Sequence, residues 1–217
     1  MLHTHIDHLV IAAPSLTAGS DYIRRTLGVP THPGGEHTGM GTHNCLVRLG
    51  ASVYLEVIAL NPAAPPARRK PLFGLDRLDP HAPPALLTWV ASCADLDAAV
   101  AASPFAHGEI IAMNRGALDW RLTIPADGIL PANGIAPSLI QWETEVHPAA
   151  SLPDAGCSLI RLEGFHQEAE RIRDFLSRTG FDGAFHITEI GTDERPYLIA
   201  HIQTPNGPRQ LRGLAGV

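Results

Sequence analysis

One block of strand-like and helix-like segments occurs twice in this sequence, and the repetition constrains the fold more than any other feature. The first block opens with DHLVI at residues 7–11 and closes with YLEVI at residues 54–58. The second block opens with LTWVA at residues 87–91 and closes with SLIQWE at residues 138–143. These short apolar runs are rich in strand-forming residues, so each block is predicted to begin and end with a strand.

Each opening strand is followed by a predicted helix. Ser15 is a suitable N-cap and Gly28 a suitable C-terminal stop for the first helix, and Asp95 can cap the second. Further strand-like runs complete the order β-α-β-β-β in both blocks. The predicted divisions are a first module, a proline-rich connector, a second module and a partial C-terminal βαββ module, at residues 1–61, 62–84, 85–146 and 156–217.

A β-α-β-β-β unit carries its helix on one face of a small sheet, so its other face must be buried against a partner. Two such units side by side can curve around a shared cleft. The sequence therefore predicts an α+β protein in which tandem modules form a cupped mixed sheet around one cleft, with the third partial module at the C-terminus. Exposed sheet edges would also allow two chains to pair as a homodimer.

The strand framework is repeated, but its ionisable residues are not. An offset of 80 residues at the first strand sets His8 on Thr88, and an offset of 85 at the last sets Glu56 on Gln141. Thr88 is a poor ligand for divalent metals, and Gln141 offers only a neutral amide oxygen. A site built on His8 and Glu56 is therefore expected to take its ionisable residues from the first module only.

Composition excludes several classes of function. The residues are 45% hydrophobic and 18% charged, which is typical of a soluble globular protein. The net charge of −6 disfavours a nucleic-acid partner, because phosphate binding needs a clustered positive face. No apolar run approaches the ~20 residues needed to span a bilayer. The three cysteines form no Cys-x-x-Cys pair and no signal peptide is evident, which favours a cytoplasmic location.

Several short motifs resemble those of one superfamily. They are HTGMGTHN at residues 37–44, YLE at 54–56 and PSLIQW at 137–142. With the duplicated unit, they resemble the vicinal oxygen chelate superfamily, which includes glyoxalase I, extradiol dioxygenases, methylmalonyl-CoA epimerase and bleomycin-resistance proteins. Within it, the motifs look like those of glyoxalase-like domain proteins. The resemblance implies the tandem-module fold but no single reaction, because the superfamily hosts several chemistries and non-enzymatic binders.

In metal-dependent members, the first strand of a module supplies one ligand and the last strand a glutamate. The resemblance therefore implies His8 and Glu56 as ligands of a divalent metal, with no counterpart in the second module. Two protein ligands, together with waters and a chelating substrate, would suit a hard cation in a weak site. His43 is the candidate for a third ligand, because it begins the strand beside Glu56.

Two other hypotheses about the role of His8 and Glu56 are compatible with the sequence. In one, Glu56 is a metal-free catalytic base that His8 orients. In the other, the pair is a buried hydrogen-bonded remnant without chemistry. The candidate substrate-binding residues are Asn44, Arg115, Trp120 and Gln141.

The expected function is binding of a small oxygen-rich substrate by a glyoxalase-like protein, through a divalent metal, for lyase, isomerase or dioxygenase-like chemistry. The alternative implied by the same resemblance is a non-catalytic protein that sequesters a small apolar or aromatic molecule in the cleft.

Overall fold

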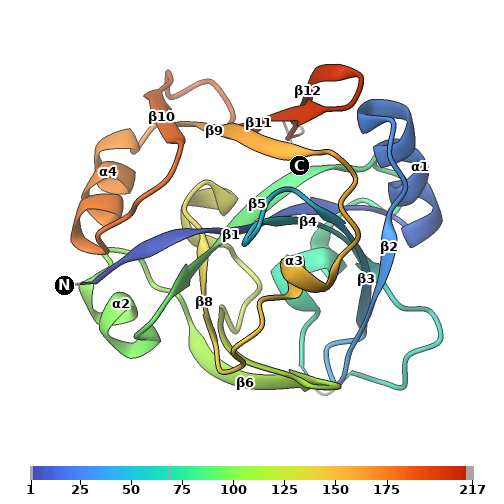
Figure 1. Cartoon of the computed structure of the whole chain (residues 1–217). Coiled ribbons are helices and arrows are strands. Elements are labelled where there is room, and N and C mark those ends of the chain that lie inside the picture. Colours follow the sequence, from blue (N-terminus) through green and yellow to red (C-terminus); the bar gives the residue numbers. More distant parts are fainter. Residues whose placement is uncertain (1, 68, 214–217) are drawn as a thin grey trace.

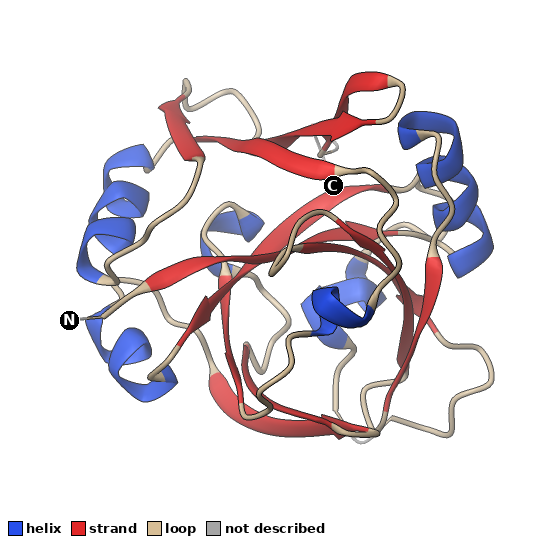
Figure 2. Cartoon of the chain, in the orientation of Figure 1, coloured by secondary structure: helices blue, strands red, loops and turns tan. Residues whose placement is uncertain are grey.

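The computed structural model describes residues 2–67 and 69–213, which form two sheets and the helices around them (Figures 1 and 2). Within these residues, the larger sheet has eight strands in the order β2-β3-β4-β1-β5-β8-β7-β6. The smaller sheet has four strands in the order β10-β9-β11-β12. The larger sheet curls into a half-barrel, and its edge strands β2 and β6 come into contact. None of the helices in this part of the chain is long and apolar enough to cross a membrane.

The first module builds one half of the curled sheet. Its helix begins after Ser15, whose hydroxyl accepts from the Ala18 amide, and ends at Gly28, which has a left-handed φ of 76°. Both caps were predicted from the sequence. Strand β1 pairs with β4 in parallel, and this crossover places the helix on the outer face. The elements are β1 (Thr4–Ala12), α1 (Leu16–Leu27), β2 (His32–His37), β3 (Thr42–Arg48) and β4 (Tyr54–Leu60).

The second module repeats this topology, with β5 parallel to β8, and two short 3-10 helices lie in its connections. The predicted α+β class and the tandem modules around one cleft are confirmed. The elements are η1 (Leu72–Arg77), β5 (Ala85–Cys93), α2 (Leu96–Ala102), β6 (Glu109–Arg115), β7 (Leu118–Ile124), η2 (Pro131–Gly134), β8 (Ser138–Trp142) and α3 (Pro148–Ser151).

Strands β1 and β5 join the two modules as an antiparallel pair. His8 pairs with Val90, and Val10 pairs with Thr88. With an offset of 80 residues, His8 corresponds to Thr88 and Val10 corresponds to Val90, so each of the two pairs maps onto the other. The predicted offset at the first strand is therefore correct. The two modules are therefore related by an approximate two-fold axis through this pair of strands.

The predicted overlay of the last strands is wrong. In the first module, Glu56 pairs with Val10. In the second module, the counterpart of Val10 is Val90, which pairs with Ser138. Glu56 therefore corresponds to Ser138 rather than to Gln141. Gln141 lies on the outer face instead, where its Oε1 accepts from the first backbone amide of α2. Because side chains alternate along a strand, a shift of three positions moves a residue to the other face of the sheet.

The C-terminal part has the same order of elements but a different pairing. Its first strand lies between β10, to which it is parallel, and β11, to which it is antiparallel. In the two modules, by contrast, the first strand pairs with the last. The elements are β9 (Ser158–His166), α4 (Ala169–Arg178), β10 (Phe185–Glu189), β11 (Tyr197–Thr204) and β12 (Gly207–Arg212).

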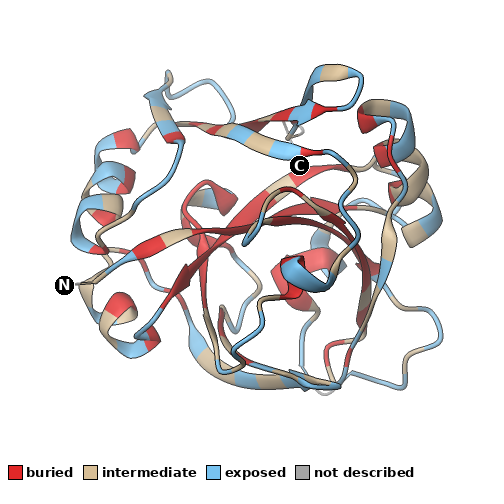
Figure 3. Cartoon of the chain, in the orientation of Figure 1, coloured by how far each residue is buried: buried red, intermediate tan, exposed pale blue. Residues whose placement is uncertain are grey.

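This smaller sheet covers the outer face of β5, and its strand β12 also contacts α1 (Figures 1 and 3). Trp89 lies at the centre of the contact and is fully buried. Its indole Nε1 donates to the Ile135 carbonyl at 2.8 Å, and its ring packs against Phe181 and Phe185. The outer face of the half-barrel is therefore a continuous core, which leaves the concave face for function.

Replacing Trp89 should weaken this core. Trp89→Ala is expected to lower the free energy of unfolding by about 3–5 kcal/mol, because the cavity lies between two rigid sheets. Urea denaturation followed by circular dichroism measures the change. Ile160→Ala, at a side chain that is 44% exposed, is the control and should change stability little. A loss for Trp89→Ala below ~1 kcal/mol would contradict its central position.

Candidate functional site

Four polar side chains from four neighbouring strands meet on the concave face. They are His8 of β1, His37 of β2, Asn44 of β3 and Glu56 of β4, and all four are buried. Leu46 pairs with Glu56, so Asn44, two residues before Leu46, lies on the same face of the sheet. The cluster is therefore a direct consequence of strand order and register.

The Glu56 carboxylate is the centre of the cluster. Its Oε1 accepts a hydrogen bond of 2.6 Å from the Asn44 amide and lies 3.7 Å from Nε2 of His37. Its Oε2 lies 3.6 Å from Nε2 of His8. Glu56 is thus surrounded by two imidazoles and an amide, with Oε2 the less occupied oxygen.

His37 is held as a neutral acceptor toward this cluster. Its Nδ1 lies 2.9 Å from the Thr42 hydroxyl, and its Nε2 lies 3.3 Å from the Asn44 amide nitrogen. Burial lowers the pKa of His37, although the nearby Glu56 acts to raise it. An amide nitrogen can only donate, so Nε2 of His37 accepts and Nδ1 carries the hydrogen.

Arg115 reaches the cluster from the opposite edge of the sheet. Its guanidinium donates to Oδ1 of Asn44 at 3.2 Å and lies 5.9 Å from the centre of the Trp120 ring. A Cβ atom on Gly35 would come within 2.7 Å of Cδ of Arg115. Glycine at position 35 therefore lets the stem of Arg115 cross the gap between β2 and β6.

Asp7 joins the site because β1 is irregular at this point. Ile6 pairs with Ala91 and His8 pairs with the adjacent Val90, so Asp7 is an extra residue in a β-bulge. A bulge suspends the alternation of side chains and can re-aim one of them. The Asp7 carboxylate consequently lies 2.6 Å from Nδ1 of His8, although the two residues are adjacent in the strand.

Asp7 is completely buried and accepts from three donors. Besides His8, its Oδ2 accepts from the Trp142 indole at 2.8 Å and from Nε2 of His147 at 3.1 Å. Burial alone would raise the pKa of Asp7, but the hydrogen bonds from His147 and His8 outweigh it and hold the pKa well below its usual range. Since an ionised carboxylate only accepts, Nδ1 of His8 carries a hydrogen, and Nε2 is the atom presented to Glu56.

The space beside Glu56 is small. The cavity has a volume of about 30 Å³, which is room for about one water molecule. Leu72 and Phe73 of η1 form one wall, and Phe73 has a left-handed φ of 56°. Such a conformation is strained for an aromatic residue and marks a segment held in place by its surroundings. Leu72, Phe73 and Arg115 therefore border the space in which a substrate would meet Glu56.

The structure brings most of the predicted site residues together. His8, Glu56, Asn44, Arg115 and Trp120 all line this cavity.

The other two predicted residues lie elsewhere. His43 shares a face of β3 with Cys45, which packs in the outer core, so it points away from Glu56. Gln141 is bound to the amide of Leu96 and to Arg121 on the outer face.

The sequence reasoning did not include Asp7, His37 or Tyr54 in the site. Tyr54 stacks on the His8 ring with centroids 4.5 Å apart. The position of Asp7 directly before His8 was a signal, but simple alternation places adjacent side chains on opposite faces. His37 was not among the candidate residues, because the glycine-rich residues around it were expected to form a loop or an irregular strand edge.

The side chains of this cluster can supply at most two ligands to a metal ion. Among residues 2–67 and 69–213, no group of three or more His, Cys, Asp or Glu side chains is placed to hold a metal ion. Nε2 of His8 and Oε2 of Glu56 could together bind a single ion. Thr88, the counterpart of His8 in the second module, uses its hydroxyl to donate to the Gly134 carbonyl. A closed site with four protein ligands is not built here.

Two βαβββ modules joined through their first strands, with a polar site on the concave face, define a protein of the vicinal oxygen chelate type. The chain belongs to the glyoxalase-like domain family, whose family model matches residues 6–180. The family predicted from the sequence motifs is therefore confirmed. No protein with a curated description matches the chain.

Solved structures similar to the chain were also found. A hypothetical protein from Staphylococcus aureus superposes with a TM-score of 0.59 at 15% sequence identity, covering 96% of this chain and 84% of that one. A mutant of 4-hydroxymandelate synthase from Streptomyces coelicolor gives a TM-score of 0.46 at 16% identity, covering 98% and 63%. Methylmalonyl-CoA epimerase from Mycobacterium tuberculosis gives 0.39 at 18% identity, covering 63% and 85%. At these identities the likeness concerns the fold alone.

Removing the charge of Asp7 should change the hydrogen position on His8. In Asp7→Asn the side-chain amide can donate to Nδ1, so the hydrogen is expected to move to Nε2, where it would point at Glu56. Nitrogen-15 NMR of the labelled imidazole distinguishes the two tautomers. An unchanged tautomer in the folded variant would show that Asp7 does not orient His8.

The same substitution should change the acid sensitivity of folding. Because the pKa of Asp7 is depressed in the folded state, its stabilisation is present above the ordinary value of 3.8 and is lost as the pH falls below it. Asp7→Asn should be less stable at neutral pH and should lose less stability on acidification. Asp182→Asn, whose side chain is 85% exposed, is the matched control and should behave like the parent chain.

Proposed function

We propose that the chain is an enzyme that binds a small oxygen-rich substrate and moves a proton with Glu56, in a reaction of the isomerase or lyase type. One observation carries the proposal. A buried carboxylate, Glu56, shares a small cavity with a guanidinium, Arg115, and is oriented by Asn44 and His8 rather than neutralised by an ion pair with an arginine or lysine.

Arg115 is the group suited to recognise the substrate. Within the described part of the chain no carboxylate lies at ion-pair distance from its guanidinium, although the group donates to Asn44. A planar fork of donors matches a substrate carboxylate or a pair of adjacent oxygens. Trp120 supports the guanidinium and forms an apolar wall for the substrate carbon atoms.

Glu56 is the group suited to move the proton. Asn44 holds Oε1, so Oε2 is free to remove a proton from the carbon next to a substrate carbonyl. The negative charge that develops on the carbonyl oxygen would be stabilised by Arg115. Return of the proton to the other face or to a neighbouring carbon gives an isomerase, and loss of a leaving group gives a lyase.

Hydrogen–deuterium exchange tests this role without knowledge of the natural substrate. Pyruvate, 2-oxoglutarate and malonate carry acidic C–H bonds next to carbonyls, and exchange in D₂O is followed by proton NMR. We expect the protein to accelerate exchange of at least one of them, and Glu56→Gln to reduce the rate by about 10²–10⁴-fold, the usual contribution of a general base.

A matched substitution controls for folding and charge. Glu143→Gln removes an exposed glutamate of the same chain and should leave exchange unchanged. Arg115→Gln should raise the concentration of acid needed for half-maximal exchange. Exchange that persists in Glu56→Gln would disprove the assignment, and binding of these acids without any exchange would support the non-catalytic alternative.

A second version of the function includes a divalent ion. It is favoured by the two acceptor atoms His8 Nε2 and Glu56 Oε2, which face each other across 3.6 Å. An ion bound there, completed by waters and substrate, would supply polarisation of the substrate oxygens. Such a site has two protein ligands and is expected to be weak.

Titration with Mn²⁺, followed by electron paramagnetic resonance, tests this version. One weakly bound ion per chain is expected, and it should be lost in His8→Ala and in Glu56→Ala. His43→Ala removes a histidine that points to the other face, so it should bind the ion like the parent chain. Binding that survives His8→Ala and Glu56→Ala would place the ion elsewhere.

A further inference from the structure

A second and larger cavity lies at the end of the half-barrel away from Glu56. Its volume is about 540 Å³, within the range of small-molecule sites. It lies between the ends of β1 and β4 and the start of β5 on one side and β11 of the C-terminal sheet on the other. None of its lining residues lines the Glu56 cavity.

The 3-10 helix η1 forms the wall between the two cavities. Leu72 lines the Glu56 cavity, Leu75 lines the larger one, and both belong to one apolar cluster with Val10, Ile58 and Leu130. The helix η1 thus separates a small polar compartment on the concave face from a larger apolar compartment at the end of the half-barrel.

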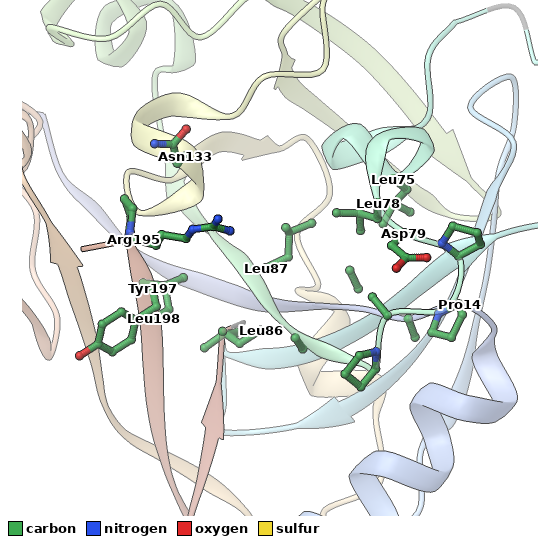
Figure 4. Close-up of a pocket in the computed structure, with 18 of the residues that line it drawn as sticks. Pro14, Leu75, Leu78, Asp79, Leu86, Leu87, Asn133, Arg195, Tyr197 and Leu198 are labelled. Atoms are coloured by element: carbon green, nitrogen blue, oxygen red, sulfur yellow. The ribbon is translucent and has the colours of Figure 1, made fainter. Parts of the chain in front are cut away.

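The larger cavity has an apolar body with restrained walls. Leu75, Leu78 and Leu87 project into it in Figure 4. Four of its lining residues are prolines, whose fixed φ limits how far the walls can collapse. A cavity of this kind is suited to an apolar group of a small molecule rather than to water alone.

Two donor groups lie at one end of this cavity. Arg195 extends over the cavity toward Leu87, with Asn133 beside it (Figure 4). Among the residues that the structure describes, neither side chain has a hydrogen-bond or ion-pair partner. Asn133 belongs to η2 and is held there in a left-handed conformation with φ of 54°.

The opposite wall carries acidic groups. Asp79 follows η1 and faces the cavity across from Arg195 in Figure 4. Asp76 of η1 also lines the cavity. Asp79 is partly engaged, because its Oδ1 accepts from the His81 amide at 2.9 Å. The cavity is therefore polarised, with donors at one end and carboxylates at the other.

We propose that this cavity is a binding site for a small carboxylic acid with an apolar body. Arg195 and Asn133 would hold the carboxylate, and the leucines would pack around the hydrocarbon. Repulsion from Asp76 and Asp79 would exclude the carboxylate from the opposite end and fix the orientation of the ligand. This site does not depend on the function proposed for Glu56.

Isothermal titration calorimetry with three ten-carbon probes tests the proposal. Decanoate, decanol and decylamine are unbranched molecules of ten carbons each, and they differ in the head group. Decanoate is expected to bind at least about tenfold more tightly than decanol, the effect of one charge-assisted hydrogen bond at a partly exposed site. Arg195→Gln should reduce decanoate binding to the level of decanol and leave decanol binding unchanged. Because Arg195 is exposed, this substitution should not disturb folding.

Three further variants locate the site. Arg209→Gln, at an exposed arginine of β12, is the matched control and should bind decanoate normally. Ala82→Trp should fill the cavity and abolish binding of decanoate and decanol, with circular dichroism confirming the fold. Glu56→Gln should bind decanoate like the parent chain, which separates this site from the proposed catalytic one. Equal binding of decanoate and decanol, tighter binding of decylamine, or unchanged binding in Ala82→Trp would overturn the proposal.

Discussion

The antiparallel pairing of β1 with β5 is the constraint on which the rest of the structure depends. It joins the two modules about an approximate two-fold axis and fixes which side chains face inward. His8 and Val10 point into the half-barrel, whereas Leu9 and Trp89 point outward into the larger core. The polar site and the docking surface for the C-terminal sheet are therefore opposite faces of the same two strands.

The β-bulge at Asp7 interrupts this alternation at one position and places a carboxylate beside His8. A buried charge without partners would be strongly destabilising, and here the adjacent His8 and the distant Trp142 and His147 donate to it. His147 and Trp142 reach Asp7 only because β8 and the segment after it fold back over the end of β1. The orientation of His8 is thus coupled to the packing of the whole second module.

The 3-10 helix η1 separates the two compartments. Leu72 and Phe73 line the polar compartment, and Leu75 lines the apolar one. The polar compartment retains room for about one water molecule, and the apolar compartment remains large. Movement of η1 would therefore change access to Glu56 and the shape of the larger cavity together.

Several parts of the fold and site were predictable from local patterns. Strand-like runs at both ends of each block, with caps at Ser15 and Gly28, were sufficient for the modules and the first helix. His8, Asn44 and Glu56 came together as expected, because strand order and alternation decide which face they occupy. His43 and Gln141 did not join them, since their positions depend on register, and one residue in register reverses the face.

The sequence by itself determined the duplicated β-α-β-β-β framework, because hydrophobic periodicity and capping residues are local properties of the chain. Only the tertiary structure decided which groups surround Glu56. Asp7 required a bulge in the pairing of β1 with β5, His37 required a strand formed by glycine-rich residues, and Arg115 required the opposite sheet edge to curl within reach. The separation of the two compartments by η1 was likewise a tertiary result, because it depends on how a connecting segment packs against strands distant in the sequence.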